Sequence, residues 1–261
     1  MKKKQGGATL IVVLVLLLVI TVVGVLAIRG SITALNIATN SQAQQLLLQN
    51  SDAAIFHSEN PKRIILNTSL SGLFGWVNLD VNKGKEMVFC YRGAERGFFD
   101  SSKTSAMKWV SGTSPDNSEK GSDGFCQLND DENFFTSGRK AVMTQVMVKA
   151  DISSNDLVGI EDPFEYMQKG TDVDKAKVMQ SSKIIVMTTS IVPAMSSASN
   201  TDINTCFSTH MNQVVIPITN PATVPAEGMD KSVAECLRDL GVPVTTQVSE
   251  YTLIQPPVRT T

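Results

Sequence analysis

The chain has 261 residues, and its 23 lysines and arginines nearly balance its 25 aspartates and glutamates, which gives a formal charge of −2. This balance argues against a basic nucleic-acid-binding protein, so we expect no nucleic-acid partner. A hydrophobic content of 42% excludes a wholly disordered chain, and two histidines leave little room for a histidine-rich metal site.

An apolar block runs from Ala8 to Ile28 and contains no charged residue. As a helix it spans roughly 32 Å, which matches the bilayer hydrocarbon core of about 30 Å. Three lysines precede the block and Arg29 follows it, which places the N-terminus in the cytoplasm. A cleaved secretory signal has a shorter apolar core of about 7–15 residues. We therefore expect residues 8–28 to span a membrane and to contact its lipid.

Beyond Arg29 the pattern becomes amphipathic, and it predicts the second half of the same helix over residues 29–60. Pro61 gives a stop, so we expect one helix from about Ala8 to about Phe56. The residues expected on its buried stripe are Ile32, Leu35, Ala38, Gln42, Leu46 and Ala53, widened by Leu47, Ala54 and Ile55.

Residues 2–13, KKKQGGATLIVV, resemble the class III leader of type IV pilins and type II secretion pseudopilins. The resemblance implies that a prepilin peptidase removes residues 1–7 by cutting between Gly7 and Ala8, and that the new N-terminus is methylated. It also implies that the apolar half of the helix passes from the membrane into a filament core. The side chains assigned to that core are Leu10, Ile11, Val12, Val13, Leu14, Leu17, Ile20, Val23 and Leu26.

Two positions depart from the general pilin pattern, in which phenylalanine comes first after the cut and glutamate fifth. Here these places hold Ala8 and Val12. PilX-type minor pilins and the tip pseudopilin K also lack this glutamate. The sequence of the apolar block is similar to that of the PilX-type group. The resemblance implies a minor pilin that primes assembly at or near the filament tip and contributes to adhesion or twitching motility.

The implied partners are other minor pilins, the major pilin, the inner-membrane assembly platform and the prepilin peptidase. The implied location is the bacterial inner membrane, as a single-pass protein, and then the extracellular pilus. A minor pseudopilin of type II secretion is the first alternative function. The second is a membrane-anchored periplasmic binding protein or enzyme, which would place a polar linker after the anchor.

Residues 61–261 are predicted to form a periplasmic or extracellular β-rich domain. Together with the helix this gives an α+β, pilin-like fold with an antiparallel sheet. A short helix is expected over Ser232–Leu240, and loops over Ser111–Asp131 and Ser196–Thr205. The expected strands are Glu86–Arg92, Ala141–Ala150, Lys183–Pro193, Gln213–Thr219 and Val244–Ile254.

Four cysteines, Cys90, Cys126, Cys206 and Cys236, follow the apolar block and contain no Cys-x-x-Cys pair. In an oxidising periplasm they are expected to form two disulfides that staple loops. Three pairings exist, and the sequential one is favoured because each bond would close a loop-rich segment.

The chain shows no nucleophile elbow, P-loop or dinucleotide fingerprint, and neither His57 nor His210 has an acid or nucleophile at a recognised spacing. We therefore expect no enzyme activity and no cofactor. Two acidic runs offer weak calcium ligands, although neither fits an EF-hand loop. The candidates are Asp116, Asp123, Asp130 and Asp131.

Overall fold

The computed structural model describes residues 8–69, 72–92, 100–109, 112–135, 140–151, 180–216 and 224–255. The chain divides into two compact units, residues 1–45 and residues 46–261. The boundary falls inside the predicted amphipathic segment 29–60, so the last part of the long helix belongs to the second unit.

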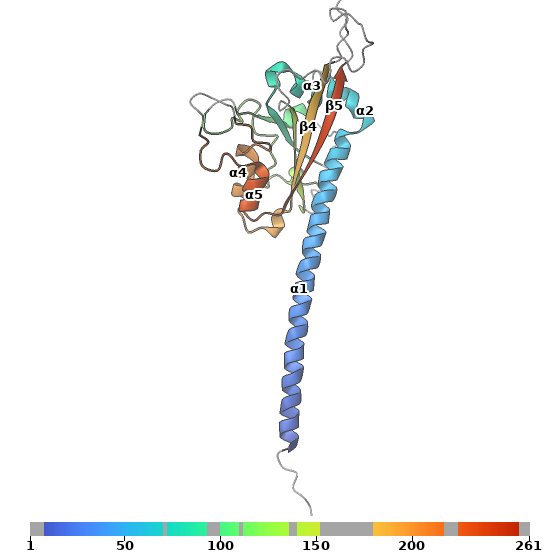
Figure 1. Ribbon diagram of the computed structural model, residues 1–261, viewed down its shortest axis with the longest axis vertical. Coiled ribbons are helices and arrows are strands. Elements are labelled where there is room, and N and C mark those ends of the chain that lie inside the picture. The colour runs from blue at the N-terminus through green and yellow to red at the C-terminus, as the bar shows by residue number, and fades with distance from the viewer. Residues whose placement is uncertain are drawn as a thin grey trace, which may run out of the picture. The chain divides into compact units, whose positions relative to one another are not determined.

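Helix α1 (Ala8–Ser58) is continuous over 51 residues (Figure 1). No proline interrupts it, and Gly24 and Gly30 weaken a helix by only about 1 kcal/mol each. It ends two residues beyond the predicted Phe56, before Pro61 opens helix α2 (Pro61–Thr68). Proline suits the first turn of a helix because the N–H that it lacks has no intrahelical partner there.

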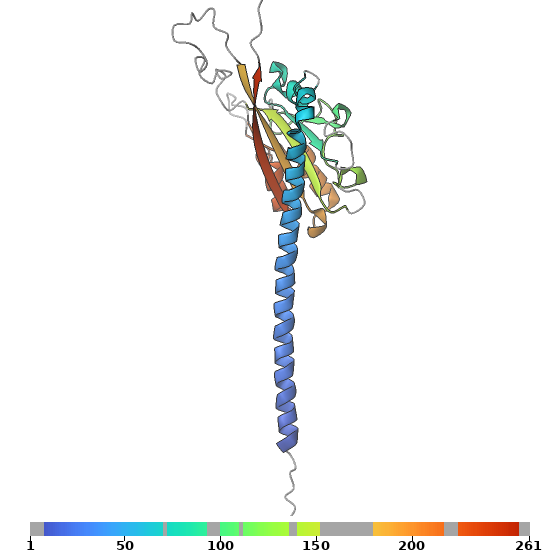
Figure 2. The same cartoon turned by 90° about the vertical axis from the view of Figure 1, so that its right-hand side faces the viewer.

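Five antiparallel strands form one sheet in the order β2-β1-β3-β4-β5. Their bounds are β1 Glu86–Cys90, β2 Ser105–Met107, β3 Met143–Ala150, β4 Gln180–Ile191 and β5 Val244–Gln255. The expected α+β fold with an antiparallel sheet is thus confirmed. β5 lies along the margin of the sheet, next to β4 (Figure 2).

The remaining described helices are short. They are α3 (Leu73–Asn78), α4 (Asn200–Thr209) and α5 (Val233–Asp239), with 3-10 turns at Asp80–Asn82, Ser101–Lys103, Asp131–Asn133 and Pro193–Met195. α5 matches the helix predicted near Ser232, whose side chain and that of Glu235 form a capping box.

Two local predictions are corrected, and one strand was not predicted. Gln213–Ile216 is not a strand, because the Gln213 backbone N–H binds a buried carboxylate instead of a neighbouring strand; residues 217–219 lie outside the described residues. The expected loop Ser196–Thr205 contains the start of α4, which the Ser199 side chain caps at Asp202 N–H. Strand β2 was not predicted, since three residues are too few to show a period.

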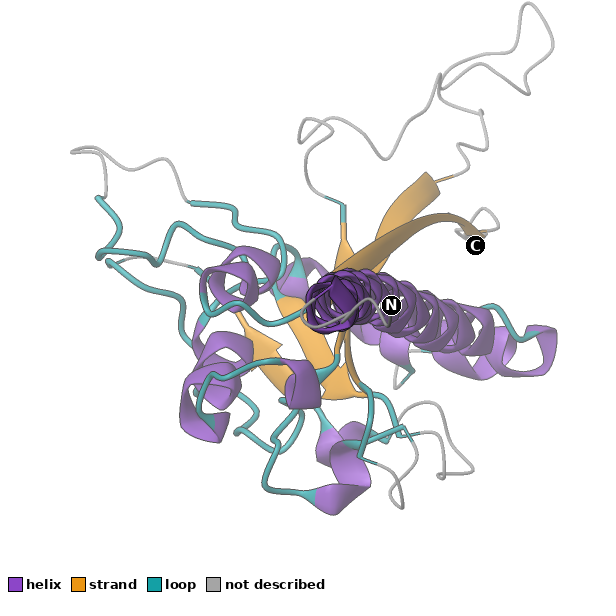
Figure 3. Cartoon of the chain, turned by 90° about the horizontal axis from the view of Figure 1, so that it is seen from below, coloured by secondary structure: helices purple, strands orange, loops and turns teal. Residues whose placement is uncertain are grey.

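The two faces of the sheet bury separate cores. On one face Ala54 of α1 and Phe74 of α3 pack with Phe89, Val146 and Val186 of the strands. On the other face α4 and α5 pack with Met143 and Ile191, together with both disulfides. α4 and α5 lie next to each other beside the sheet (Figure 1), and Figure 3 shows short helices beside the strands.

The buried side of α1 in the second unit differs from the predicted stripe. Leu46 is exposed, and the buried positions are Leu47, Asn50, Ser51, Ala54, Ile55 and Ser58. The prediction failed because it assigned apolar residues to the buried face, whereas three of the six buried side chains are polar. Ser51 and Ser58 find partners on the sheet, and Asn50 Nδ2 donates to Leu46 O within α1.

Gly124 is required by close packing between the loop before Cys126 and the sheet. A Cβ at this position would collide with backbone atoms of Val88, Thr104 and Ser105. The Gly124 N–H donates to Ser105 Oγ at 2.9 Å, which fixes the loop against β2.

Candidate functional site

The apolar part of α1 is exposed within the part of the chain that the structure describes. All nine side chains assigned to a filament core are exposed, from 56% at Leu17 to 72% at Leu10. Its most apolar 18-residue window has a mean hydropathy of 3.5, and none of that window is buried. An exposed apolar surface of this length requires lipid or other apolar chains as its surroundings.

The Thr21 hydroxyl, within this part of α1, is satisfied locally. Thr21 Oγ1 donates to Leu18 O at 2.8 Å, and the backbone amides are bonded along the helix. This arrangement suits a hydrocarbon environment, where an unpaired polar group costs several kcal/mol. By length and composition, α1 is able to cross a membrane.

The expected processing site lies at the start of α1. Ala8 is the first helical residue, and Gly7 falls outside the described residues. Val12 is 63% exposed on the first turns of the helix. The structure thus places Val12 on a surface that a neighbouring chain or lipid can contact.

Hydroxyl groups fasten the C-terminal end of α1 to the sheet. Ser51 Oγ lies 2.7 Å from Ser190 Oγ of β4, which lies 2.7 Å from Thr144 Oγ1 of β3. Ser58 Oγ lies 3.1 Å from the Tyr251 hydroxyl of β5, and that hydroxyl donates to Glu59. These paired polar contacts fix the register of α1 on the sheet without leaving these hydroxyls unpaired.

The four cysteines form Cys90–Cys126 and Cys206–Cys236, the sequential pairing. The first bond joins β1 to the loop that contains Gly124. The second joins α4 to α5, so it ties two short helices that pack on one face of the sheet.

A buried carboxylate holds the segment after α4. Glu86 of β1 is fully buried; its Oε2 accepts the Asn212 N–H and its Oε1 accepts the Gln213 N–H, both at 2.8 Å. Burial raises the pKa of Glu86, although these bonds and the charge of Lys149 oppose the shift. Burial also lowers the pKa of Lys149, against the charges of Glu86 and Asp151.

We expect Glu86→Gln to destabilise the second unit, because one backbone N–H would then face an amide NH₂ group. The cost at low pH is about 1–3 kcal/mol. Since the folded-state pKa is raised above 4.5, the stabilising effect of Glu86 is complete below pH 4.5 and falls as pH rises through the folded-state pKa. The stability difference between wild type and variant should therefore shrink as pH rises above 4.5.

The measurement is urea unfolding of the full chain in detergent, followed by fluorescence of Trp76 and Trp109, which both lie in the second unit. Glu250→Gln is the control, because Glu250 is exposed on β5. A difference that stays constant or grows between pH 4 and pH 8 would contradict the assignment.

The aspartates proposed as calcium ligands do not share a site, and three of them bind different partners. Asp116 accepts from Ser118 N–H, Asp130 caps the turn at Glu132, and Asp131 pairs with Lys140 at 2.6 Å. Asp123 is exposed. Within the described ranges, no three His, Cys, Asp or Glu side chains gather as a metal-binding group.

The two histidines occupy structural positions. His210 is buried, with Nδ1 at 3.1 Å from Lys231 O, and the His57 ring meets the edge of the Tyr91 ring at 5.6 Å between centroids. Both contacts help to position the ends of neighbouring elements.

A family model described as PilX N-terminal matches residues 5–56. The N-terminal segment is therefore similar to that of PilX-type type IV pilins. No curated protein and no solved structure matches the chain. The PilX-type segment covers nearly all of α1, including its exposed apolar part and the turns that pair with β4, and this fits a pilus protein anchored in the inner membrane.

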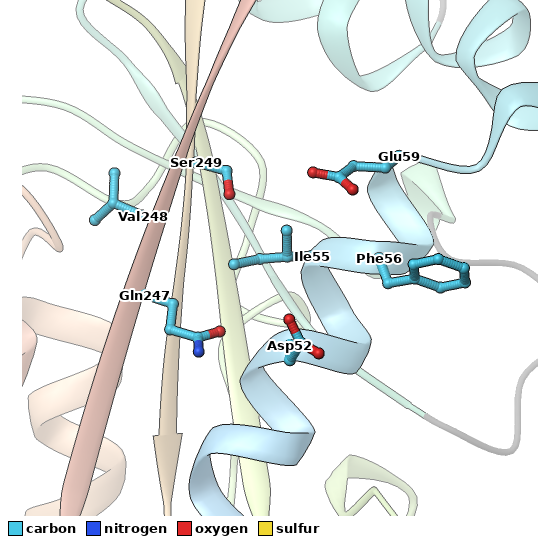
Figure 4. Close-up of a pocket in the computed structure, with 7 residues that line it drawn as sticks. All are labelled: Asp52, Ile55, Phe56, Glu59, Gln247, Val248 and Ser249. Atoms are coloured by element: carbon cyan, nitrogen blue, oxygen red, sulfur yellow. The ribbon is translucent and has the colours of Figure 1, made fainter.

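Sequence reasoning found the PilX-type segment but missed a groove beside it. The groove has a volume of about 410 Å³ and lies between the end of α1 and β5 (Figure 4). It is lined by Asp52, Ile55, Phe56, Glu59, Gln247, Val248 and Ser249. No sequence signal joins these two segments. The run rich in valine and threonine near the C-terminus indicates a strand, but not that it lies beside the end of α1.

Proposed function

We propose that the chain is a minor pilin that is processed between Gly7 and Ala8, waits in the inner membrane and then enters a type IV pilus at or near its tip. There it would prime assembly, with other minor pilins and the major pilin as neighbours. The observation that carries the proposal is the match of residues 5–56 to the PilX-type segment. Adhesion and twitching motility belong to the same proposal.

The exposed apolar part of α1 supplies the physical mechanism. Its side chains are surrounded by lipid before assembly and by the apolar helices of other subunits afterwards, so the apolar environment is exchanged and not newly created. The assembly platform must therefore supply the direction of transfer. The three lysines before the apolar block favour an N-terminus in the cytoplasm, where a prepilin peptidase would act.

Val12 supports the tip position. A carboxylate at this place would need a partner within the apolar environment, such as the N-terminal amine of a neighbouring subunit. Val12 makes no such demand, and its exposed side chain needs only apolar surroundings. That property suits the first subunit of a filament, which has no subunit beyond it.

Processing provides the direct test. We expect mass spectrometry of wild-type membranes to find a chain that begins at Ala8, and we expect Gly7→Leu to remain uncut, because a side chain would hinder the bond to be cleaved. Gly6→Ala is the matched control and should be cut normally. An intact Met1 in wild type, or equal cutting of Gly7→Leu, would refute the proposal.

Two other functions predict different behaviour. A type II secretion pseudopilin would be cut at the same bond, but its loss would impair protein secretion and leave surface pili in place. A membrane-anchored periplasmic binding protein or enzyme would remain uncut and would need a polar linker after the anchor. The continuous helix through Ser58 argues against that linker.

A further inference from the structure

Among the described residues, β5 is an edge strand of the sheet. The strand has 12 residues, and within the described part of the chain its neighbour on one side is β4, with no strand on the other. An edge strand presents unpaired N–H and C=O groups at alternate residues, and natural proteins usually block such edges with lysine, proline or a short strand. β5, VTTQVSEYTLIQ, contains no lysine, arginine or proline.

The two sides of β5 differ in character. Gln247 and Ser249 point toward α1, whereas Val248 points to the opposite side of the sheet (Figure 4). This alternation follows from the strand, in which successive side chains face opposite ways. Thr188 and Val186 of β4 stand opposite Gln247 and Ser249, so the groove side continues across the sheet.

The groove beside this edge is lined by hydrogen-bond acceptors, and its charged residues are both acidic. Glu59 and Ile55 of α1 point toward the strand in Figure 4, and Asp52 lines the same groove. Gln247 Oε1 is buried and has no hydrogen-bond partner. None of the seven lining residues carries a positive charge. The groove therefore complements a long cationic side chain, whose methylene groups would pack on Ile55.

We propose that the edge of β5 accepts an extended segment of a partner protein as a sixth strand, and that a lysine or arginine of that segment enters the groove beside Asp52 and Glu59. Backbone pairing would supply affinity, and the cation would supply selectivity, as in other cases of strand addition. A strand added beyond β5 points every second side chain to the α1 side, which carries one of them over the groove. The proposal concerns the second unit alone and does not depend on filament entry.

We infer an extended protein segment as the partner because the surface has two parts. The edge of β5 needs a backbone to pair with, and the groove needs a cationic side chain. A free cation or small amine would satisfy the carboxylates but leave the backbone groups of β5 unpaired. A globular partner surface without a free strand would likewise leave the backbone groups of β5 unpaired. The alternation of groove-side and outer-side residues on β5 instead requires a chain with a two-residue period.

The test uses the full chain in detergent and labelled nine-residue peptides of alternating threonine and valine. One peptide carries a central arginine, and a second carries a central glutamate. We expect the arginine peptide to bind at least about tenfold more tightly, because the glutamate peptide places like charges together. Two further arginine peptides, N-methylated at one or the other set of alternate residues, should differ, since only one set pairs with the edge.

Asp52→Asn should weaken binding of the arginine peptide by about fivefold, the upper range for a solvent-accessible ion pair. The matched control is Glu250→Gln, which removes a carboxylate from the same strand; residue 250 stands opposite Ile185, on the side away from the groove. Asp52 is exposed and Glu250 is exposed, so neither change should disturb folding, which circular dichroism will verify.

Four results would overturn the proposal. They are equal affinity for the arginine and glutamate peptides, equal binding of both N-methylated peptides, equal losses for Asp52→Asn and Glu250→Gln, and self-association that the arginine peptide does not displace. The last result would assign the edge to a second copy of this chain.

Discussion

Leu14→Arg combined with Leu17→Arg should release the chain from the membrane. Each arginine at the centre of a spanning helix costs about 2.5–3.5 kcal/mol, so the pair costs roughly 5–7 kcal/mol. Both side chains are exposed within the chain, at 60% and 56%, so the substitutions disturb no internal packing. We expect most of the variant to be extracted from membranes by alkaline carbonate, whereas the wild type stays in the membrane fraction.

The matched control places the same charges beyond the apolar block. Ile32 and Leu35 are exposed at 54% and 66% on the same helix, and arginine at both positions should leave membrane retention unchanged. If the two double variants are extracted to the same extent, or if the first is retained like the wild type, residues 8–28 are not the anchor.

The position of α1 and four of the strands could be predicted because their signals are local. An apolar block without charge, an amphipathic continuation and Pro61 define α1 to within two residues at its end. Runs rich in Val, Ile, Met and Thr indicate β1, β3, β4 and β5. Local signals fail where the deciding contact is distant, as at Gln213, whose N–H belongs to Glu86 and not to a neighbouring strand.

Of the two candidate surfaces, the apolar half of α1 could be predicted from the sequence and the groove beside β5 could not. The apolar half of α1 is readable from sequence because membrane insertion depends on composition and length. The groove is not, because it joins Asp52 and Ile55 to Gln247, which the fold alone brings together. The buried face of α1 was mispredicted for a related reason. A serine such as Ser51 is expected at the surface, but here its hydroxyl is buried in a hydrogen bond with the Ser190 hydroxyl.

Removal of the Cys206–Cys236 disulfide should strongly destabilise the second unit. The bond closes a segment with a sequence separation of 30, for which the chain-entropy model gives about 3.5–4 kcal/mol. We expect Cys206→Ala with Cys236→Ala to lower the free energy of unfolding by that amount, measured by urea titration of the full chain in detergent with tryptophan fluorescence.

The control and the local packing sharpen this expectation. Thr205→Ala changes an exposed neighbour of Cys206 on α4 and should alter the free energy of unfolding by less than about 0.5 kcal/mol. Cys206 is buried beside Phe207 and Leu237, so alanine there also removes apolar contact between α4 and α5. Equal unfolding midpoints for the double variant and Thr205→Ala would mean that this core holds the two helices without the bond, and that the disulfide constrains neither state.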